Sequence, residues 1–284
     1  VRRRRRSGLQ TAIGWDSVKR ISPGRWIACA LVPLCLGAAL RAADTYPVTP
    51  SERAAYEYLQ DGGQPVKARE TAEAVLRVSP DSFVAYYVIG AVYSRVEGSL
   101  PKAHHYLSKA RRLIERKWGV PVPSSGPWLW HARVIEELID VTAEMDRYEE
   151  QLELLAAHDR LYRPPLTASW GWPLMKLGRM DEARAKVQEA LRSDKPGTVT
   201  HAMNTLGAIE NEMDRPEASY EVYTRLVEMV RKNGWVMHTV YLRNAGAASL
   251  GLLRFEEAER WLLESAKQFD YGTFSNPWRS LAVL

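Results

Sequence analysis

Glycines recur along this 284-residue chain at intervals typical of a helical repeat. Gly171, Gly207 and Gly246 each follow an apolar residue, and they lie 36 and 39 residues apart. A fourth glycine, Gly90, precedes Gly171 by 81 residues, which leaves room for two longer units. A period of about 34–40 residues, built as helix–turn–helix, is the signature of a helical solenoid. We therefore predict a fold in which short helix pairs stack one upon the next.

Each of these glycines is followed by a second helical pattern, in which a small residue precedes a bulky one by four positions. The small residues are Ala103, Ala183, Ser219 and Ala258, and the bulky ones are Leu107, Val187, Tyr223 and Leu262. A glycine lets a facing helix approach to the roughly 8–10 Å of close helix packing. A pair this short cannot bury its apolar face alone, so neighbouring pairs must stack into one continuous core. The predicted fold class is all-α.

Two segments resemble the tetratricopeptide repeat family most closely. In the first, Ala68, Leu76 and Pro80 occupy the family's small-residue, leucine and repeat-ending proline positions. In the second, residues 178–191, the turn glycine, the alanines and the leucine fall in the family's register. The resemblance covers residues 51–284, and it implies a right-handed helical solenoid of about six stacked helix–turn–helix repeats.

Two regions depart from the regular pattern. In the unit at 127–162, Ile139 and Gln151 stand where the family usually has glycine and alanine. This unit follows a stretch rich in proline and glycine, residues 119–127, where we expect a loop and an irregular stacking angle. Near the end of the sequence, Asn276 opens the pattern of a new first helix, so we expect a seventh repeat that is truncated.

The first 42 residues have the features of an export leader. Residues 26–40 contain no charged side chain, three basic residues precede them, and Ala42 completes a small-residue cleavage signal. This arrangement is typical of a secretory signal peptide, and the apolar run is short for a membrane-spanning helix. We predict an export leader at 1–42 that is cleaved near Ala42, a linker at 43–50 and the solenoid at 51–284. The predicted location is periplasmic or extracellular; an uncleaved anchor and a chance apolar stretch remain alternatives.

The charge of the chain is unevenly distributed. The formal net charge is +5, but residues 1–42 carry +8 and residues 43–284 therefore carry −3. A mildly acidic body argues against nucleic acid as a partner, because nucleic-acid binding needs a basic face. The two cysteines, Cys29 and Cys35, both lie in the leader, so the body has no thiol for catalysis or for a metal.

No residue pattern indicates catalysis. The six histidines lack the spacing of metal ligands, and His104 and His105 are adjacent, so on a helix their side chains diverge by about 100°. The adjacent glutamate pairs are typical of solvated helix faces, and no phosphate-binding loop, nucleophile elbow or zinc-peptidase motif is present. We predict a protein that is not an enzyme and needs no metal or cofactor.

The resemblance implies a concave surface, lined by the first helix of each pair, that captures a protein or peptide. The positions that fall on this face by resemblance are Tyr87, Arg95, Trp172, Lys176, Asn204, Asn211 and Arg243. They are expected to bind a partner, although solvated helix positions would show the same pattern. The predicted function is an exported scaffold that meets a membrane only through an uncleaved leader. The alternative is an accessory repeat module at the front of a larger exported enzyme or of an envelope transport or assembly component.

Two tryptophans of one predicted helix are expected to differ in role. Trp170 takes the apolar core position of its repeat, and Trp172 is rotated about 200° from it, toward the inner face. Exposed tryptophans on concave surfaces are frequent anchors in binding sites. We therefore expect Trp170 to support the fold and Trp172 to contact a partner, unless both simply pack against the neighbouring prolines.

Overall fold

The structure, a computed structural model, describes residues 46–60, 63–268, 277 and 281–282, and over these residues it is helical without a β-strand. The predicted leader at 1–42 and most of the predicted seventh repeat lie outside the described residues. The elements are α2 (Pro50–Gln60), α3 (Pro65–Val78), α4 (Phe83–Val92), the π-helix η3 (Tyr93–Glu97), α5 (Leu100–Trp118), α6 (Trp128–Glu144), α7 (Tyr148–Leu161), the 3-10 helix η4 (Thr167–Ser169), α8 (Gly171–Lys176), α9 (Met180–Ala190), α10 (Pro196–Glu212), α11 (Pro216–Lys232), α12 (Thr239–Gly251) and α13 (Phe255–Lys267).

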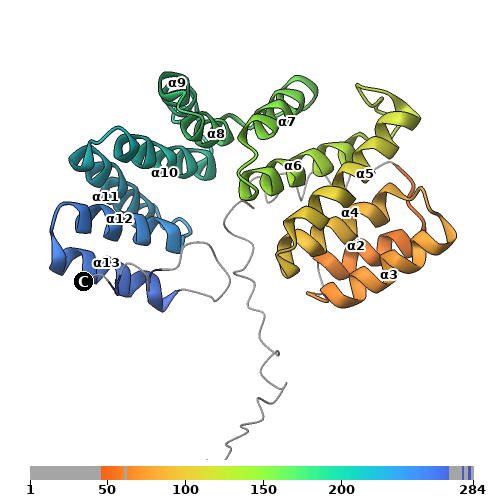
Figure 1. Ribbon diagram of the computed structural model, residues 1–284, viewed down its shortest axis with the longest axis horizontal. Helices are drawn as coiled ribbons and strands as arrows, with labels where there is room; N and C mark the ends of the chain where they lie inside the picture. The colour runs from red at the N-terminus through yellow and green to blue at the C-terminus, as the bar shows by residue number, and fades with distance from the viewer. Residues whose placement is uncertain (1–45, 61–62, 269–276, 278–280, 283–284) are drawn as a thin grey trace, which may run out of the picture.

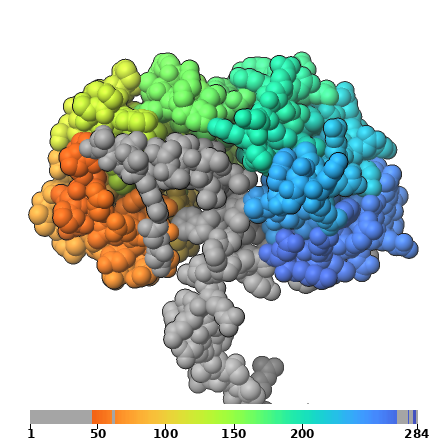
Figure 2. Space-filling view, turned by 180° about the vertical axis from the view of Figure 1, so that it is seen from behind, coloured from red at the N-terminus to blue at the C-terminus, as the bar shows by residue number. Residues whose placement is uncertain are grey.

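Consecutive helices pack against each other in chain order and form an arch (Figure 1). The pairs are α2–α3, α4–α5, α6–α7, α8–α9, α10–α11 and α12–α13. At the top of the arch, α6 and α8 lie on the inner side, beneath α7 and α9. Seen from behind, the N-terminal and C-terminal limbs descend on opposite sides of the arch (Figure 2). The predicted all-α solenoid of stacked helix pairs is confirmed.

The glycines lie where two helices of one pair approach most closely. A Cβ atom added to Gly90 would lie 2.7 Å from Leu107, and one added to Gly246 would lie 2.6 Å from Leu262. The corresponding distance is 2.5 Å from Gly207 to the Tyr223 ring. Real Cβ atoms do not approach other atoms so closely, so only glycine fits without a shift of its neighbours. The predicted contacts between each glycine and the bulky residue of the next helix are confirmed.

The turn between the two helices of a pair has the same backbone conformation in four of the pairs. The second residue after the first helix has a positive φ at Asp146 (56°), Gly178 (73°), Asp214 (56°) and Leu253 (58°). Glycine adopts this left-handed conformation without cost, and aspartate adopts it more readily than most residues. Leucine does not, so Leu253 is held there by the packing of the helices on both sides.

The unit at 127–162 differs from its neighbours, as its sequence indicated. The expected loop separates α5 from α6. Ile139 and Gln151 are buried in place of the usual small residues, at 3% and 4% exposure. His131 is fully buried between this unit and α5: its Nδ1 meets the Tyr162 hydroxyl, and its Nε2 lies 3.1 Å from Glu115. Burial lowers the pKa of His131 and so favours the neutral imidazole, although Glu115 opposes this effect.

The apolar core consists of two clusters. The larger one extends from Ala55 in α2 to Ile209 in α10, and the smaller one extends from Met203 in α10 to Trp261 in α13. The helix α10 therefore contributes side chains to both clusters. Since each pair contacts mainly its neighbours, this arrangement is typical of a solenoid, whose stability is a sum of local stacking contacts.

Candidate protein-binding face

Three successive first helices, α8, α10 and α12, carry five polar or aromatic side chains on neighbouring units of the solenoid. These are Trp172 and Lys176 on α8, Asn204 on α10, and Arg243 and Asn244 on α12; we call them the α8–α12 face. Four of the five were predicted to line the concave surface. The Asn244 amide donates a hydrogen bond of 2.8 Å to the Asn204 side-chain oxygen, which ties α12 to α10 across two units of the solenoid.

Arg243 carries a charge that no carboxylate balances among the described residues. Its guanidinium is half-buried, and its Nε atom is buried without a hydrogen-bond partner. Burial lowers the pKa of Arg243, and only the nearby Tyr223 hydroxyl opposes this effect. A buried donor without a partner costs about 1–3 kcal/mol, and more when the group is charged. Arg243 therefore keeps a positive charge that no acidic side chain of the described residues offsets.

Trp172 presents an aromatic surface at the other end of the face. It is 36% exposed, which is high for a large aromatic residue. Its indole hydrogen-bonds to the hydroxyl of Tyr148, which in turn donates to Asp146. The Lys176 ammonium lies 5.0 Å from the centre of the Trp172 ring. The ring is thus held in one orientation while its surface stays accessible, as an anchor for a partner requires.

Lys176 and Asn211 complete the predicted set on this side of the arch. The Lys176 ammonium lies 3.5 Å from a carboxylate oxygen of Glu212, so its charge is already paired. Asn211 is exposed at the C-terminal end of α10. Lys176 already has an ionic partner and Asn211 is exposed to solvent, so we place both residues at the edge of the face.

Tyr87 is buried and Arg95, though a quarter exposed, is already paired within the chain, so neither is available to a partner as predicted. Tyr87 is 2% exposed and packs against Tyr56 and Trp130, with ring centres 6.3 and 5.7 Å away. The Arg95 guanidinium is bound to the Glu137 carboxylate of α6, including a contact of 2.9 Å from Nε. Burial opposes the charge of Arg95, but attraction to Glu137 outweighs it and raises the pKa.

The reason for this difference is the local packing of the N-terminal limb. Aromatic residues on α2 and α6 close over the inner side of α4, so the repeat position of Tyr87 points into the core. The π-helical turn η3 then directs Arg95 toward α6. Such turns insert an extra residue and re-aim the side chains that follow. Together these residues join two repeats rather than open toward a ligand.

Trp170 lies where the sequence placed it. It is partly buried against the larger apolar cluster, and its indole nitrogen donates a hydrogen bond of 2.9 Å to Asp159. The two tryptophans therefore differ in exposure, as predicted. The sequence analysis missed Asn244 and Tyr148. A signal for Asn244 was present, because two adjacent polar residues, Arg243 and Asn244, interrupt the apolar pattern of α12.

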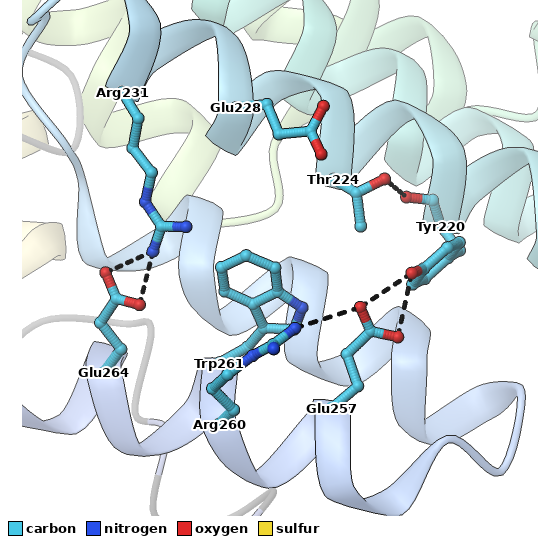
Figure 3. A pocket seen from close by; sticks show the side chains of 8 residues that line it. All are labelled: Tyr220, Thr224, Glu228, Arg231, Glu257, Arg260, Trp261 and Glu264. Carbon is cyan, nitrogen blue, oxygen red and sulfur yellow. Dashed lines mark hydrogen bonds and ion pairs between the residues drawn. The ribbon is translucent and has the colours of Figure 1, made fainter.

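A depression of about 400 Å³ lies between α11 and α13 (Figure 3). Four of its five charged side chains pair with one another or with Tyr220, and Glu228 is the exception. Arg231 holds both oxygens of Glu264 at 2.6 Å, and the Tyr220 hydroxyl lies 2.9 Å from both oxygens of Glu257. The Trp261 ring fills the floor between Arg231 and Arg260, at 4.9 and 5.1 Å from their guanidinium carbons. These contacts join two second helices.

The described residues offer little for other kinds of chemistry. Within residues 46–60 and 63–268, no group of three or more histidine, cysteine or acidic side chains is arranged to hold a metal ion. None of the helices in the described part of the chain is both long and apolar enough to cross a membrane.

Solved structures share this fold. MamA from Desulfovibrio magneticus RS-1 is 15% identical, with a TM-score of 0.51 over 66% of this chain and 98% of its own. PilF from Pseudomonas aeruginosa is 16% identical, with a TM-score of 0.52 over 82% of this chain and 96% of its own. Cut9, in the Cut9–Hcn1 assembly, is 16% identical, with a TM-score of 0.55 over 83% of this chain and 42% of its own.

These neighbours are tetratricopeptide repeat proteins. No family model matches the sequence, and no curated protein matches it either. At this level of identity the likeness shows the fold alone. The chain therefore has the fold of the tetratricopeptide repeat proteins, as the resemblance implied.

Proposed function

We propose that this protein is a scaffold without catalytic activity of its own, and that it binds a protein or peptide through the α8–α12 face. The observation that carries the proposal is Arg243, a half-buried cation with an unpartnered Nε and no carboxylate beside it among the described residues. A charge kept in such a place costs stability unless a partner supplies its counter-ion. The fold supports the same reading, because solenoids present extended surfaces to partners.

The chemistry of the face indicates the kind of partner. Arg243 selects a carboxylate, from an acidic side chain or from the end of a peptide, because guanidinium groups bind carboxylates in a fixed geometry. The Asn204 and Asn244 amides can donate to and accept from the backbone of an extended peptide. Trp172 offers an apolar surface to a side chain of the same peptide. The proposed ligand is therefore an extended segment with a carboxylate and an apolar side chain.

The proposal is tested with two substitutions on the face. Trp172→Ala is expected to weaken binding by about 2 kcal/mol, the size typical of an interface anchor. Arg243→Gln is expected to weaken the binding of acidic peptides and to leave their amidated or neutral counterparts unaffected. Trp172→Ala should keep the unfolding midpoint of the original protein, and Arg243→Gln should keep or raise it, because it removes a partly buried charge without a counter-ion. Binding is measured by fluorescence anisotropy with a panel of extended peptides that differ in terminal charge.

Arg225→Gln serves as the matched control, because Arg225 is exposed on α11, away from the face. It should change neither binding nor stability. The assignment of the face is wrong if Trp172→Ala and Arg243→Gln bind every peptide as the original protein does. It is also wrong if Trp172→Ala loses stability as severely as Trp170→Ala.

We also propose that the protein is exported, on the evidence of the leader at 1–42. Its apolar run and the positive charge before it support a periplasmic or extracellular location. Residues 1–60, fused to a reporter that is active only outside the cytoplasm, should give an active product. The N-terminus of that product should lie near Ala43. A full-length, inactive fusion in the cytoplasm would rule out export.

A further inference from the structure

The helix α5 carries an unusual line of positive charge. Lys102, His105, Lys109, Arg112 and Arg116 follow one another at intervals of three and four residues, so they lie on one side of the helix. We call these five residues the α5 stripe. Four of them are exposed and Lys109 is half-buried. The stripe contains no acidic residue, although the chain outside the leader is acidic overall.

The apolar side of α5 accounts for the packing of this helix, but not for the positive charge of the stripe. Ala103, Leu107, Ala110 and Ile114 are fully buried there and attach the helix to its neighbours. Helix packing therefore requires only these apolar positions and leaves the other side free to vary. Neutral or mixed charges would serve a merely solvated face, and like charges three or four residues apart repel each other.

The charges of the stripe are not neutralised within the chain. The ion pairs of α5 involve His104, Arg111 and Glu115, which lie off the stripe. Among the described residues none of the five stripe residues forms an ion pair. Lys102 and Lys109 lie over tyrosine rings, with their ammonium groups 5.0 Å from Tyr93 and 5.9 Å from Tyr86. These contacts position the two lysines and leave their charge uncompensated.

The basic surface is narrow. Glu150 of α7 meets His104 at 2.9 Å, which places the start of α7 beside α5, and the neighbouring Glu149 and Glu153 are exposed there. On the other side, α3 mixes Glu70 and Glu73 with Lys67 and Arg69. The stripe is therefore bordered by acidic side chains on the α7 side. Its fourteen-residue span corresponds to roughly 21 Å and holds four lysine and arginine cations, with His105 between the first two.

We infer that the α5 stripe docks an acidic helical segment of a partner protein. A helix with carboxylates at every third and fourth position repeats its side chains at the same interval of about 5 Å, so its carboxylates can face the four cations. An anionic membrane surface is broad and would meet the acidic side chains at the start of α7 as well. The acidic border at α7 therefore favours a narrow, linear partner. This site is separate from the α8–α12 face, which lies on other helices.

The inference is tested with a designed probe. A labelled alanine-based helical peptide of roughly 20 residues carries glutamate at every third and fourth position; a matched peptide carries glutamine instead. The full chain should bind the glutamate peptide at least tenfold more tightly than the glutamine peptide at low salt. High salt should remove most of the difference, because it screens exposed charges.

Two double variants locate the site. Arg112→Glu with Arg116→Glu should weaken binding of the glutamate peptide at least tenfold. The matched reversal on α11, Arg225→Glu with Lys232→Glu, should change it less than twofold. Circular dichroism should show the same helix content for both variants, since all four residues are exposed.

The inference is overturned if both peptides bind equally or if the two double variants behave alike. It is also overturned if the chain prefers vesicles of phosphatidylcholine and phosphatidylglycerol, or a single-stranded oligonucleotide, and loses that binding with Arg112→Glu and Arg116→Glu. In that case the stripe would serve a membrane or a nucleic acid. If the inference about the α5 stripe is overturned, the test of the α8–α12 face with Trp172→Ala and Arg243→Gln is unaffected.

Discussion

Replacing Gly207 by leucine is expected to destabilise the protein severely, because the new side chain would collide with an aromatic ring. A Cβ atom at position 207 would already lie 2.5 Å from the Tyr223 ring, before the rest of the leucine is added. The ring is rigid and buried, so α10 and α11 would have to move apart. Overpacking usually costs about 1–3 kcal/mol, and more when the backbone must shift. Urea unfolding monitored by circular dichroism measures the loss.

Gly251 provides a matched control for this substitution. It too belongs to a first helix, as the last residue of α12, but nothing lies within 4 Å of a Cβ atom added there. Gly251→Leu should therefore unfold at the same urea concentration as the original protein, or slightly higher, since leucine favours helix. Equal losses from the two substitutions would mean that Gly207 does not lie at a close helix contact.

Removing the carboxylate of Glu137 is the second change for which we expect a large effect. Glu137 is 5% exposed, and it neutralises Arg95 across the interface between α4 and α6. Glu137→Ala would remove the carboxylate that lies closest to the partly buried Arg95 guanidinium. Breaking a buried pair by removing one partner costs about 3–5 kcal/mol. We expect the lower part of this range, because the Arg95 side chain keeps a quarter of its surface in water.

A double substitution separates charge from packing. Arg95→Met combined with Glu137→Leu should recover most of the loss, because an apolar pair of similar volume needs no counter-ion. Glu182→Ala breaks an exposed ion pair with Arg179 and should leave the unfolding midpoint unchanged. If Glu137→Ala unfolds like Glu182→Ala, the pair does not hold the two repeats together.

The sequence predicted the close helix contacts because they depend on short spacings. Gly90 and Leu107 belong to adjacent helices of one unit, so a repeat pattern alone can place them together. The left-handed turns were recognised only at Gly178. Asp146, Asp214 and Leu253 adopt the same conformation without glycine, because the packed helices on each side impose it. The positions of glycine alone therefore reveal too few of the turns that share this left-handed conformation.

The candidate site was harder to predict, because it depends on contacts between units. The pair of Arg95 and Glu137 joins residues 42 positions apart, and it turns a predicted ligand-binding residue into part of the interior. The contact of Asn244 with Asn204 spans 40 positions. Neither contact can be predicted from the sequence of a single repeat. Position within a repeat indicates which helix side a residue occupies, but its neighbours in the next units decide whether that side is open.

Because the apolar core divides into two clusters at α10, a ligand on the α8–α12 face would change how firmly the C-terminal limb is held. The helices α11, α12 and α13 share a cluster of their own, so this end of the solenoid can open while the helices before α10 stay folded. Asn204 stands on α10, where the clusters meet, and Arg243 stands beyond it on α12. A peptide that contacts both would span the joint and clamp the C-terminal limb in place. Binding to the α8–α12 face would then make the whole arch more rigid.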